Sequence, residues 1–307
     1  MEKPKPTLLL TGASGMLGGY LKEVFSDYSV TTLGRSEDDD IKASFGNGGE
    51  VPQLGYYDLV VHTASDHDVE RAIDVNFEGT RKLLAALGKN PPRCFVFVSC
   101  AEVYGRNYGG EISEKNHLWI EDKFGQSKVL AAREVESWCK EHGVISTILR
   151  PAPMFGRGMK GKWAETFNAV ESGRYILVRG NSTVCSIVLA YDVARVVREI
   201  HTIGGIYNVA DPRHHRFADI IEAMGANSGR FRTPYRLPAK WARLAARIGD
   251  RLPLSGILPT SASLAFQLTS LTYDCSALLD ALPGFRFLNT VDVIARRDPG
   301  YPYSDPD

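Results

Sequence analysis

Residues 8–18 read Leu8-Leu9-Leu10-Thr11-Gly12-Ala13-Ser14-Gly15-Met16-Leu17-Gly18, an apolar run that ends in a glycine-rich turn. The residues that follow, up to Phe25, place apolar side chains on one face at helical spacing. The stretch therefore predicts a buried strand that passes through a tight turn directly into a helix.

Glycine is needed at three positions of this turn for three physical reasons. Gly12 lets the chain turn, Gly15 lets the backbone approach a pyrophosphate without an intervening Cβ atom, and Gly18 lets the helix pack close to the strand. The helix N-terminus then offers free N–H groups and the positive end of its dipole to phosphates. Because the pattern follows a predicted strand and opens an amphipathic helix, it favours dinucleotide binding over a plain glycine turn.

The spacing Gly-x-x-Gly-x-x-Gly within Thr-Gly-Ala-Ser-Gly resembles that of the extended short-chain dehydrogenase/reductases, the NAD-dependent epimerase/dehydratases. The resemblance extends over nearly the whole chain. Residues 158–163 and 207–211 resemble bacterial reductases and 4-epimerases of UDP-linked 4-keto-sugars. It implies an oxidoreductase that acts at C4 of a nucleotide-sugar, its small-molecule partner, in surface polysaccharide synthesis.

Composition narrows the classes of protein. With 307 residues and 44% apolar content, the chain can bury a sizeable core. Basic and acidic residues number 36 each, which disfavours a nucleic-acid partner. The absence of a long apolar run or a leader-like N-terminus indicates a cytoplasmic protein without a membrane partner. Five cysteines without a Cys-x-x-Cys pair fit a reducing compartment and argue against a metal site.

Strands and helices alternate over the first half of the chain, which predicts an α/β fold: a Rossmann doubly wound parallel sheet with a smaller C-terminal substrate-binding lobe. Continuous apolar strands are expected at residues 58–62 and 94–99, and a helix at 69–87. We expect a Rossmann domain at 1–157 and a mixed lobe at 158–307, with segments near 184–200 and 206–211 returning to the Rossmann domain.

The end of the second predicted strand bears on the choice of cofactor. NAD-preferring Rossmann sites place an acid there for the ribose 2′-hydroxyl, whereas an arginine accommodates the 2′-phosphate of NADP. Here Gly34-Arg35-Ser36 has no acid, so NADP is favoured over NAD, with a solvated loop arginine as the alternative. The expected cofactor-binding residues are Gly12, Ala13, Ser14, Gly15, Met16, Leu17, Gly18, Arg35, Asp40, Ile41, Thr63, Ala64, Lys128 and Pro151.

In the superfamily that the chain resembles, a Tyr-x-x-x-Lys signature exchanges the hydroxyl proton while a hydride moves between the sugar and the nicotinamide. The lysine lies on the same helical face as the tyrosine, lowers its pKa and holds the nicotinamide ribose. Here the signature reads Phe124-Gly125-Gln126-Ser127-Lys128. Because phenylalanine cannot transfer a proton, and losing a positioned acid or base costs about 10²–10⁴-fold, we expect impaired activity.

Two further positions belong to the expected catalytic site. The family's strand-end Ser/Thr corresponds to Cys100, a poorer donor, with Ser99 next to it on the opposite face. The resemblance also implies that Asn76 kinks its helix and anchors the lysine through water. Family members pair through the two helices that here contain Asn76 and Lys128, so a homodimer is a further expectation.

Expected substrate-binding residues lie in the second half. Relatives carry a basic residue where this chain has Cys185, just before Ser186, and Arg179 or Lys162 is the expected substitute because basic side chains suit phosphate. Trp163 completes this set.

Alternatives to the missing tyrosine remain. Tyr104 or Tyr108 reaching the pocket is less favoured, because neither shares the helical turn of the lysine, and His214-His215 is expected to be solvated on a loop. Phe124 reflects natural divergence or a deliberate Tyr→Phe change, and Cys100 and Cys185 favour divergence. The alternative function is a catalytically silent dinucleotide-binding sensor or scaffold.

Overall fold

A parallel sheet of seven strands forms the centre of the computed structural model, which describes residues 4–46, 48–105, 110–120, 122–227, 234–251 and 258–296. Neighbouring strands follow the order β11-β6-β5-β4-β1-β2-β3, and every pairing is parallel. Their bounds are β1 (Thr7–Thr11), β2 (Ser29–Gly34), β3 (Ile41–Lys42), β4 (Leu59–His62), β5 (Cys94–Val98), β6 (Ile145–Pro151) and β11 (Gly205–Val209).

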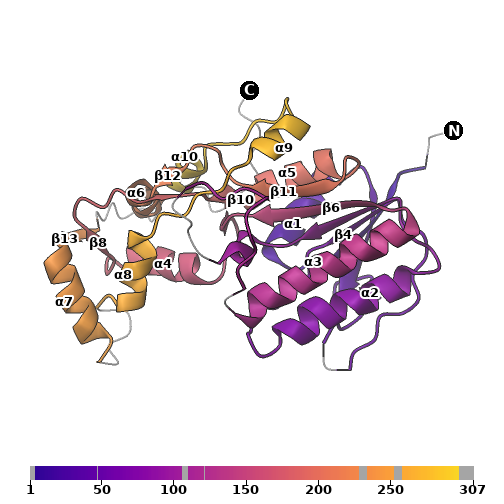
Figure 1. Cartoon of the computed structure of the whole chain (residues 1–307), viewed down its shortest axis with the longest axis horizontal. Coiled ribbons are helices and arrows are strands. Elements are labelled where there is room, and N and C mark those ends of the chain that lie inside the picture. Colours follow the sequence, from indigo (N-terminus) through magenta and orange to yellow (C-terminus); the bar gives the residue numbers. More distant parts are fainter. Residues whose placement is uncertain are drawn as a thin grey trace.

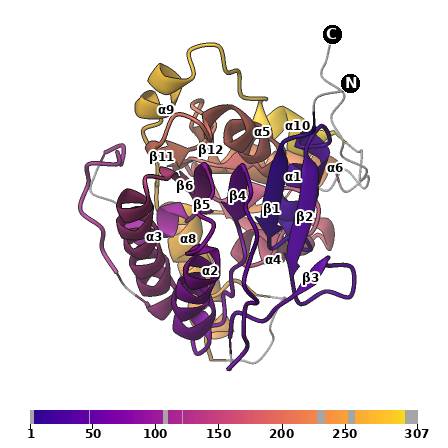
Figure 2. The same cartoon turned by 90° about the vertical axis from the view of Figure 1, so that its right-hand side faces the viewer.

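Helices cover both faces of this sheet because successive strand residues point to opposite sides. Leu8 and Leu10 belong to one buried cluster and Leu9 to another. Helices α1 (Met16–Val24) and α5 (Ala190–Ile200) pack together, and α2 (Gly79–Leu87) and α3 (Lys123–His142) lie side by side on the other face (Figures 1 and 2). The expected doubly wound Rossmann fold is confirmed.

The single helix expected at residues 69–87 is instead a π-helix, η1 (Ile73–Glu78), continued by α2. Asn76, in the middle of η1, is buried and hydrogen-bonded to residues outside the helix, as described below. A Cβ atom on Gly79 would lie 2.5 Å from Cβ of Phe45. The hydrogen bonds of Asn76 and the close contact between Gly79 and Phe45 therefore occur within or next to η1. Short π-helical segments of this kind often occur at functional sites.

The second lobe extends away from the sheet (Figure 1). Its helices are α4 (Lys162–Glu171), α6 (Phe217–Asn227), α7 (Ala239–Gly249), α8 (Ser261–Leu268) and α10 (Thr290–Ala295). Helix α9 (Ser276–Ala281) instead packs against β11 at the edge of the sheet. Short strands pair as β7 (Met154–Phe155) with β10 (Val188–Leu189), β9 (Val184–Cys185) with β12 (His215–Arg216), and β8 (Ile176–Val178) with β13 (Tyr235–Leu237). No helix in the described ranges is both long and apolar enough to cross a bilayer.

Candidate active site

The glycine-rich turn between β1 and α1 has the geometry that its three glycines predict. Gly12 has a φ of +73°, and a Cβ atom there would lie 2.6 Å from Oγ1 of Thr63. A Cβ atom on Gly18 would lie 2.6 Å from Cα of Ala13. Gly15 is the N-cap residue of α1, and its N–H donates to the Gly12 carbonyl oxygen at 2.9 Å. Only glycine permits the turn at Gly12 and the close packing at Gly18.

This end of α1 fits an anionic ligand. The helix has no side-chain cap and no acidic residue in its first turn, so its first N–H groups and its dipole are available to an anion. Ser14 and Gly15 are exposed, whereas Ala13 and Leu17 are buried and Met16 is half-buried. In a parallel sheet the carboxyl ends of the strands share one edge, which brings Thr63, Ser99 and Pro151 to the side of this turn. These features suit the pyrophosphate of a dinucleotide.

A series of hydrogen bonds links the end of β1, next to the glycine-rich turn, to η1 and α2. Oγ1 of Thr63 donates to the Thr11 carbonyl oxygen at 2.8 Å, and the Thr11 hydroxyl lies 2.6 Å from Nδ1 of His62. Nε2 of His62 lies 2.9 Å from the Thr80 hydroxyl, which itself donates to the Asn76 carbonyl oxygen. Nε2 therefore carries the imidazole proton. Burial lowers the pKa of His62 to about 3, so this histidine is neutral and structural.

Arg35 follows β2 directly, is exposed, and makes no ion pair or hydrogen bond with the residues that the structure describes. Oδ2 of Asp40 accepts from the Thr32 N–H at 2.8 Å and the Thr32 hydroxyl at 2.9 Å, and these hydrogen bonds lower the pKa of Asp40. Ile41, the first residue of β3, is half-buried beside it. Asp40 thus joins its loop to β2 through Oδ2.

Asp39 adds an acidic group at the end of β2 that the sequence analysis missed. Its buried carboxylate accepts from the Ser36 N–H at 2.8 Å. A Cβ atom on Gly34 would lie 2.5 Å from Oδ2 of Asp39, so glycine is what lets this acid reach the strand end. Arg35 and Asp39 therefore act in opposite directions on a 2′-phosphate.

Lys128 lies in α3, which begins after Asp122, an N-cap whose carboxylate accepts from the Gly125 N–H at 2.7 Å. The side chain of Lys128 is 3% exposed, and Nζ donates to the Val98 carbonyl oxygen at 2.9 Å. Nζ also lies 4.8 Å from the centroid of the Phe97 ring. Burial lowers the pKa of Lys128 to about 8, so the amine remains charged at neutral pH beside the end of β5.

Asn76 connects η1 to the start of α3. Its Oδ1 accepts from the Asp66 N–H at 2.7 Å, and Nδ2 donates to the Asp66 carbonyl oxygen at 3.0 Å and to Oγ of Ser127 at 2.9 Å. The Ser127 hydroxyl donates to the Phe124 carbonyl oxygen at 2.7 Å. Asn76 thus contacts the residue next to Lys128 directly, and both hydrogens of its amide go to protein atoms.

Ser99 and Cys100 directly follow β5, close to Lys128. Ser99 is buried and Cys100 is half-buried. Burial, followed by the charge of Glu102, raises the pKa of Cys100 to about 12, so its thiol is neutral and a poor nucleophile. Glu102, on the turn η2 (Ala101–Tyr104), is exposed, and desolvation followed by the charge of Asp122 raises its pKa. A carboxyl group thus lies near Lys128 without having been expected from the sequence.

His67 lies against Phe124. Its imidazole stacks on the ring of Phe124, with centroids 4.6 Å apart and planes inclined by 24°. Phe124 is 5% exposed, whereas His67 is exposed. Desolvation, followed by the charge of Lys128, lowers the pKa of His67, and Asp66 opposes this shift. A titratable ring therefore lies against Phe124 and within electrostatic reach of Lys128.

Tyr104 does not supply a phenol to this site. It is 1% exposed, its hydroxyl donates to Oδ1 of Asn208 at 2.7 Å, and it accepts from Nη1 of Arg150 at 2.8 Å. This agrees with the low expectation placed on it. Tyr108 lies outside the described residues.

Two of the expected substrate-binding residues begin α4. Lys162 is exposed, with Nζ 5.3 Å from the centroid of the Phe266 ring. Trp163 is 7% exposed and packs against three aromatic rings, those of Phe155, Phe217 and Phe266. Trp163 therefore belongs to the core of the second lobe, and its contact with a substrate stays a prediction.

The other two expected substrate-binding residues, Arg179 and Ser186, lie outside α4. Arg179 is exposed after β8. Ser186 is buried, accepts from the Tyr273 N–H at 2.9 Å, and lies 3.0 Å from Nδ1 of His214. His214 has a φ of 45°, and its Nε2 lies 3.1 Å from Oε1 of Glu111, so the prediction that it is solvated is wrong. Within the described ranges, no three His, Cys, Asp or Glu side chains are grouped to hold a metal ion.

Comparison with known proteins places this architecture in a family. The family model described as "NAD dependent epimerase/dehydratase family" matches residues 8–210. The chain belongs to this family. The matched region includes the glycine-rich turn, Asn76 and Lys128, so the resemblance inferred from the sequence is confirmed.

Two curated relatives are identical to this family member at about a quarter of the aligned positions. An Escherichia coli O157:H7 protein, N-acetyl-alpha-D-glucosaminyl-diphospho-ditrans,octacis-undecaprenol 4-epimerase, is 26% identical over 62% of this chain and 62% of its own length. The match therefore spans about three fifths of that relative. UDP-glucose 4-epimerase of Vibrio cholerae is 25% identical over 68% of this chain and 74% of its own.

Among solved structures, RMD from Pseudomonas aeruginosa, complexed with NADPH, superposes with a TM-score of 0.69. The superposition covers 95% of this chain and 97% of that one at 17% identity. At this identity the likeness concerns the fold, and it includes the second lobe.

Proposed function

We propose that this family member is an NAD(P)-dependent oxidoreductase that acts at C4 of a sugar carried on a diphosphate, in surface polysaccharide synthesis. The observation that carries the proposal is Lys128, a buried amine fixed at the same carboxyl edge of the sheet that holds the uncapped N-terminus of α1. The names of the two relatives suggest two carriers for the sugar, UDP and a polyprenyl diphosphate. UDP is the carrier that the sequence resemblance implies.

The fit of the cofactor rests on the same features. The N–H groups at the start of α1 would hold the pyrophosphate, Arg35 the adenosine end, and Lys128 the nicotinamide ribose. Exposed Arg35 favours NADP, and buried Asp39 favours NAD. We retain NADP as the proposed cofactor because Arg35 is exposed, whereas Asp39 is committed to the Ser36 N–H.

The chemistry requires a hydride and a proton to leave the sugar together. Oxidation at C4 would remove the hydrogen of the C4–H bond with its electron pair and the proton of the C4 hydroxyl, which would leave a 4-keto sugar. The reverse step restores the alcohol. The bound cofactor supplies the hydride acceptor, and the chain must supply the base.

His67 is the proposed base. Its imidazole lies on the Phe124 ring, where the family places its phenol, and is exposed to a ligand. Because its pKa is lowered below the ordinary value of 6.5, the ring is neutral at pH 7 and ready to accept a proton. The charge of Lys128 that lowers this pKa also favours return of the proton to the sugar.

Further parts of the proposal follow from the resemblance. The protein acts in the cytoplasm as a homodimer, paired through α2 and α3, which cover one face of the sheet (Figure 2). A second candidate function is a silent dinucleotide-binding sensor or scaffold, with impaired or no turnover. Phe124 in place of the family tyrosine favours it.

The test combines cofactor titration with a turnover screen. NADPH and NADH are titrated by fluorescence, and the wild type and Phe124→Tyr are then assayed on UDP-linked and polyprenyl diphosphate-linked sugars. Turnover by the wild type supports the proposed enzyme. Cofactor binding with turnover only by Phe124→Tyr supports the silent protein. Absence of cofactor binding in both proteins contradicts both candidates.

A further inference from the structure

Helix α7 presents its large apolar side chains to solvent and its small ones to the protein. Ala242 and Ala246 are 0% and 1% exposed, whereas Trp241, Leu244 and Ile248 are 62%, 47% and 42% exposed. A surface helix of a globular domain ordinarily shows the opposite arrangement. Exposed apolar side chains gathered on one helix indicate an interaction site.

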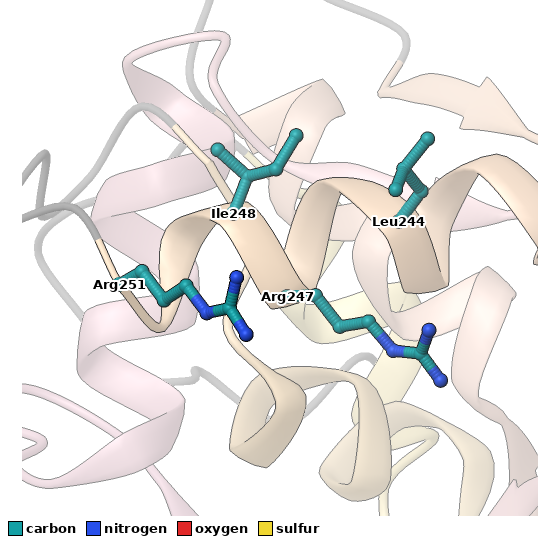
Figure 3. Close-up of a pocket in the computed structure, with 4 residues that line it drawn as sticks. All are labelled: Leu244, Arg247, Ile248 and Arg251. Atoms are coloured by element: carbon teal, nitrogen blue, oxygen red, sulfur yellow. The ribbon is translucent and has the colours of Figure 1, made fainter.

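The three apolar side chains form one stripe, because positions 241, 244 and 248 follow helical spacing. Arg247 and Arg251 lie beside this stripe, and together with Leu244 and Ile248 they line a shallow depression. Figure 3 shows the two aliphatic side chains rising from one side of α7 and the two guanidinium groups extending along the next. The outward surface is therefore divided between apolar and basic halves.

Basic side chains outnumber acidic ones on this surface. Lys240, Arg243, Arg247 and Arg251 are all exposed. The one acidic residue of 239–251 is Asp250, whose carboxylate accepts from the N–H and hydroxyl of Ser261 at 2.9 and 2.5 Å. A second copy of the same surface would be repelled, whereas an anionic surface would be attracted.

We propose that α7 docks this protein onto an anionic phospholipid surface. Tryptophan and aliphatic side chains would enter the boundary between head groups and acyl chains, and the basic side chains would contact the phosphates. In Figure 1, α7 lies at the far end of the second lobe from the β-sheet, so docking leaves the cofactor-binding turn free. The surface is local, which is why the balanced net charge of the sequence did not predict it.

Docking of α7 onto a membrane does not depend on the sugar chemistry, but it would be useful for only one of the two proposed sugar carriers. A sugar on a polyprenyl diphosphate is held at a membrane surface, where a docked enzyme would meet it. A UDP-linked sugar needs no such contact. Vesicle binding and substrate choice can therefore succeed or fail separately.

Vesicle flotation of the full chain tests the proposal. We expect the wild type to float with mixed phosphatidylcholine–phosphatidylglycerol vesicles, to remain behind with pure phosphatidylcholine, and to be released by high salt. Leu244→Ser combined with Ile248→Ser should reduce binding about tenfold or more, and Arg247→Gln about fivefold. These side chains are exposed, so the variants should fold, which circular dichroism checks.

Matched controls use equally exposed residues elsewhere. Ile203→Ser removes an apolar side chain that is 49% exposed, and Lys140→Gln removes a charge on α3. Both should float like the wild type. No flotation of the wild type, or equal loss in the controls, overturns the proposal. A dimer in sedimentation that Leu244→Ser with Ile248→Ser dissociates, without vesicle binding, also overturns it and assigns the surface to a second copy.

Discussion

The imidazole of His67 is stacked on the ring of Phe124, with centroids 4.6 Å apart and planes inclined by 24°. We expect His67→Gln to lower turnover about 10²–10⁴-fold, the ordinary effect of losing a positioned acid or base. Glutamine keeps the size and polarity of the side chain, so affinity for NADPH should stay within about twofold of the wild type, because the side chain was exposed. Steady-state kinetics and fluorescence titration measure the two effects.

His142 offers a matched control for this change. It also stacks on an aromatic ring of α3, that of Trp138, with centroids 4.3 Å apart. His142→Gln should leave turnover unchanged. Equal activity of the two variants would show that His67 only packs on Phe124.

The pH profile gives a second test of His67. Desolvation followed by the charge of Lys128 holds the pKa of His67 below 6.5. As a base the imidazole must be neutral, so kcat/KM for oxidation should rise with pH through a pKa below 6.5 and then level off. In Phe124→Tyr combined with His67→Gln this limb should disappear. Imidazole resonances followed by NMR in the cofactor-free protein should titrate at the same pH.

Two adjacent glycines of α1, Gly18 and Gly19, allow a matched comparison of Gly→Ala variants at the cofactor-binding turn. A Cβ atom on Gly18 would lie 2.6 Å from Cα of Ala13, whereas one on Gly19 would meet nothing within 4 Å. Gly18→Ala should therefore weaken NADPH binding strongly and lower stability by about 1–3 kcal/mol through overpacking. Gly19→Ala should raise the free energy of unfolding by about 0.5–1 kcal/mol. Urea denaturation measures the stability of both variants, and fluorescence titration measures their affinity for NADPH. Similar effects of the two substitutions would contradict the close packing of Gly18.

The local sequence predicted the turn because its geometry depends on near neighbours. An apolar strand, three spaced glycines and a helical face all lie within residues 8–25, and the structure has each of them. Lys128 was likewise found from its motif. The second lobe was harder to interpret, because Trp163 is buried by aromatic rings from separate elements, which spacing along the chain does not reveal.

His67 and Asp39 were missed for different physical reasons. Asp39 is placed by a local turn against Ser36 and Gly34, whereas His67 lies on a loop whose path is set by tertiary contacts. Asn76 fixes the loop before η1 by binding both backbone groups of Asp66, and this contact places His67 over Phe124. The expected absence of a tyrosine at position 124 was a reason to look for another titratable side chain, but the distance between His67 and Phe124 cannot be read from the order of residues along the chain.

Arg35 and Asp39 make the cofactor preference testable. Arg35→Ala should reduce the affinity for NADPH about 10–100-fold, the loss of charge-assisted hydrogen bonds to a phosphate. The affinity for NADH should change little. Lys22→Ala, which removes a charge on the exposed side of α1, is the control. Equal losses for both cofactors would contradict the NADP assignment.

Asp211 should make stability depend on acid. Its burial opposes ionisation, but hydrogen bonds from His215, Thr290 and Arg213 prevail and lower its pKa to about 2, against 3.8 when unfolded. Its contribution of about 2 kcal/mol is therefore complete above pH 3.8 and is lost as pH falls towards 2. Asp211→Ala should cost about 3 kcal/mol at pH 7 and remove this dependence. As a control, Asp38→Asn changes an exposed carboxylate and should alter the free energy of unfolding by less than about 0.5 kcal/mol.

Lys128 should also make stability rise with pH, but in the alkaline range, because its charge is held in the folded protein at a cost. Burial lowers its pKa from 10.5 to about 8. The penalty is fully present below pH 8 and disappears as pH rises towards 10.5, which corresponds to a gain of about 3 kcal/mol. Lys128→Met should lack this gain and should lose turnover, while Lys140→Met on the exposed side of α3 should keep both. Urea denaturation of the three proteins from pH 7 to pH 10.5 measures the effect. A constant difference in stability between wild type and Lys128→Met across this range would mean that the amine is not charged and buried at neutral pH, and would remove the main support for its role at the nicotinamide ribose.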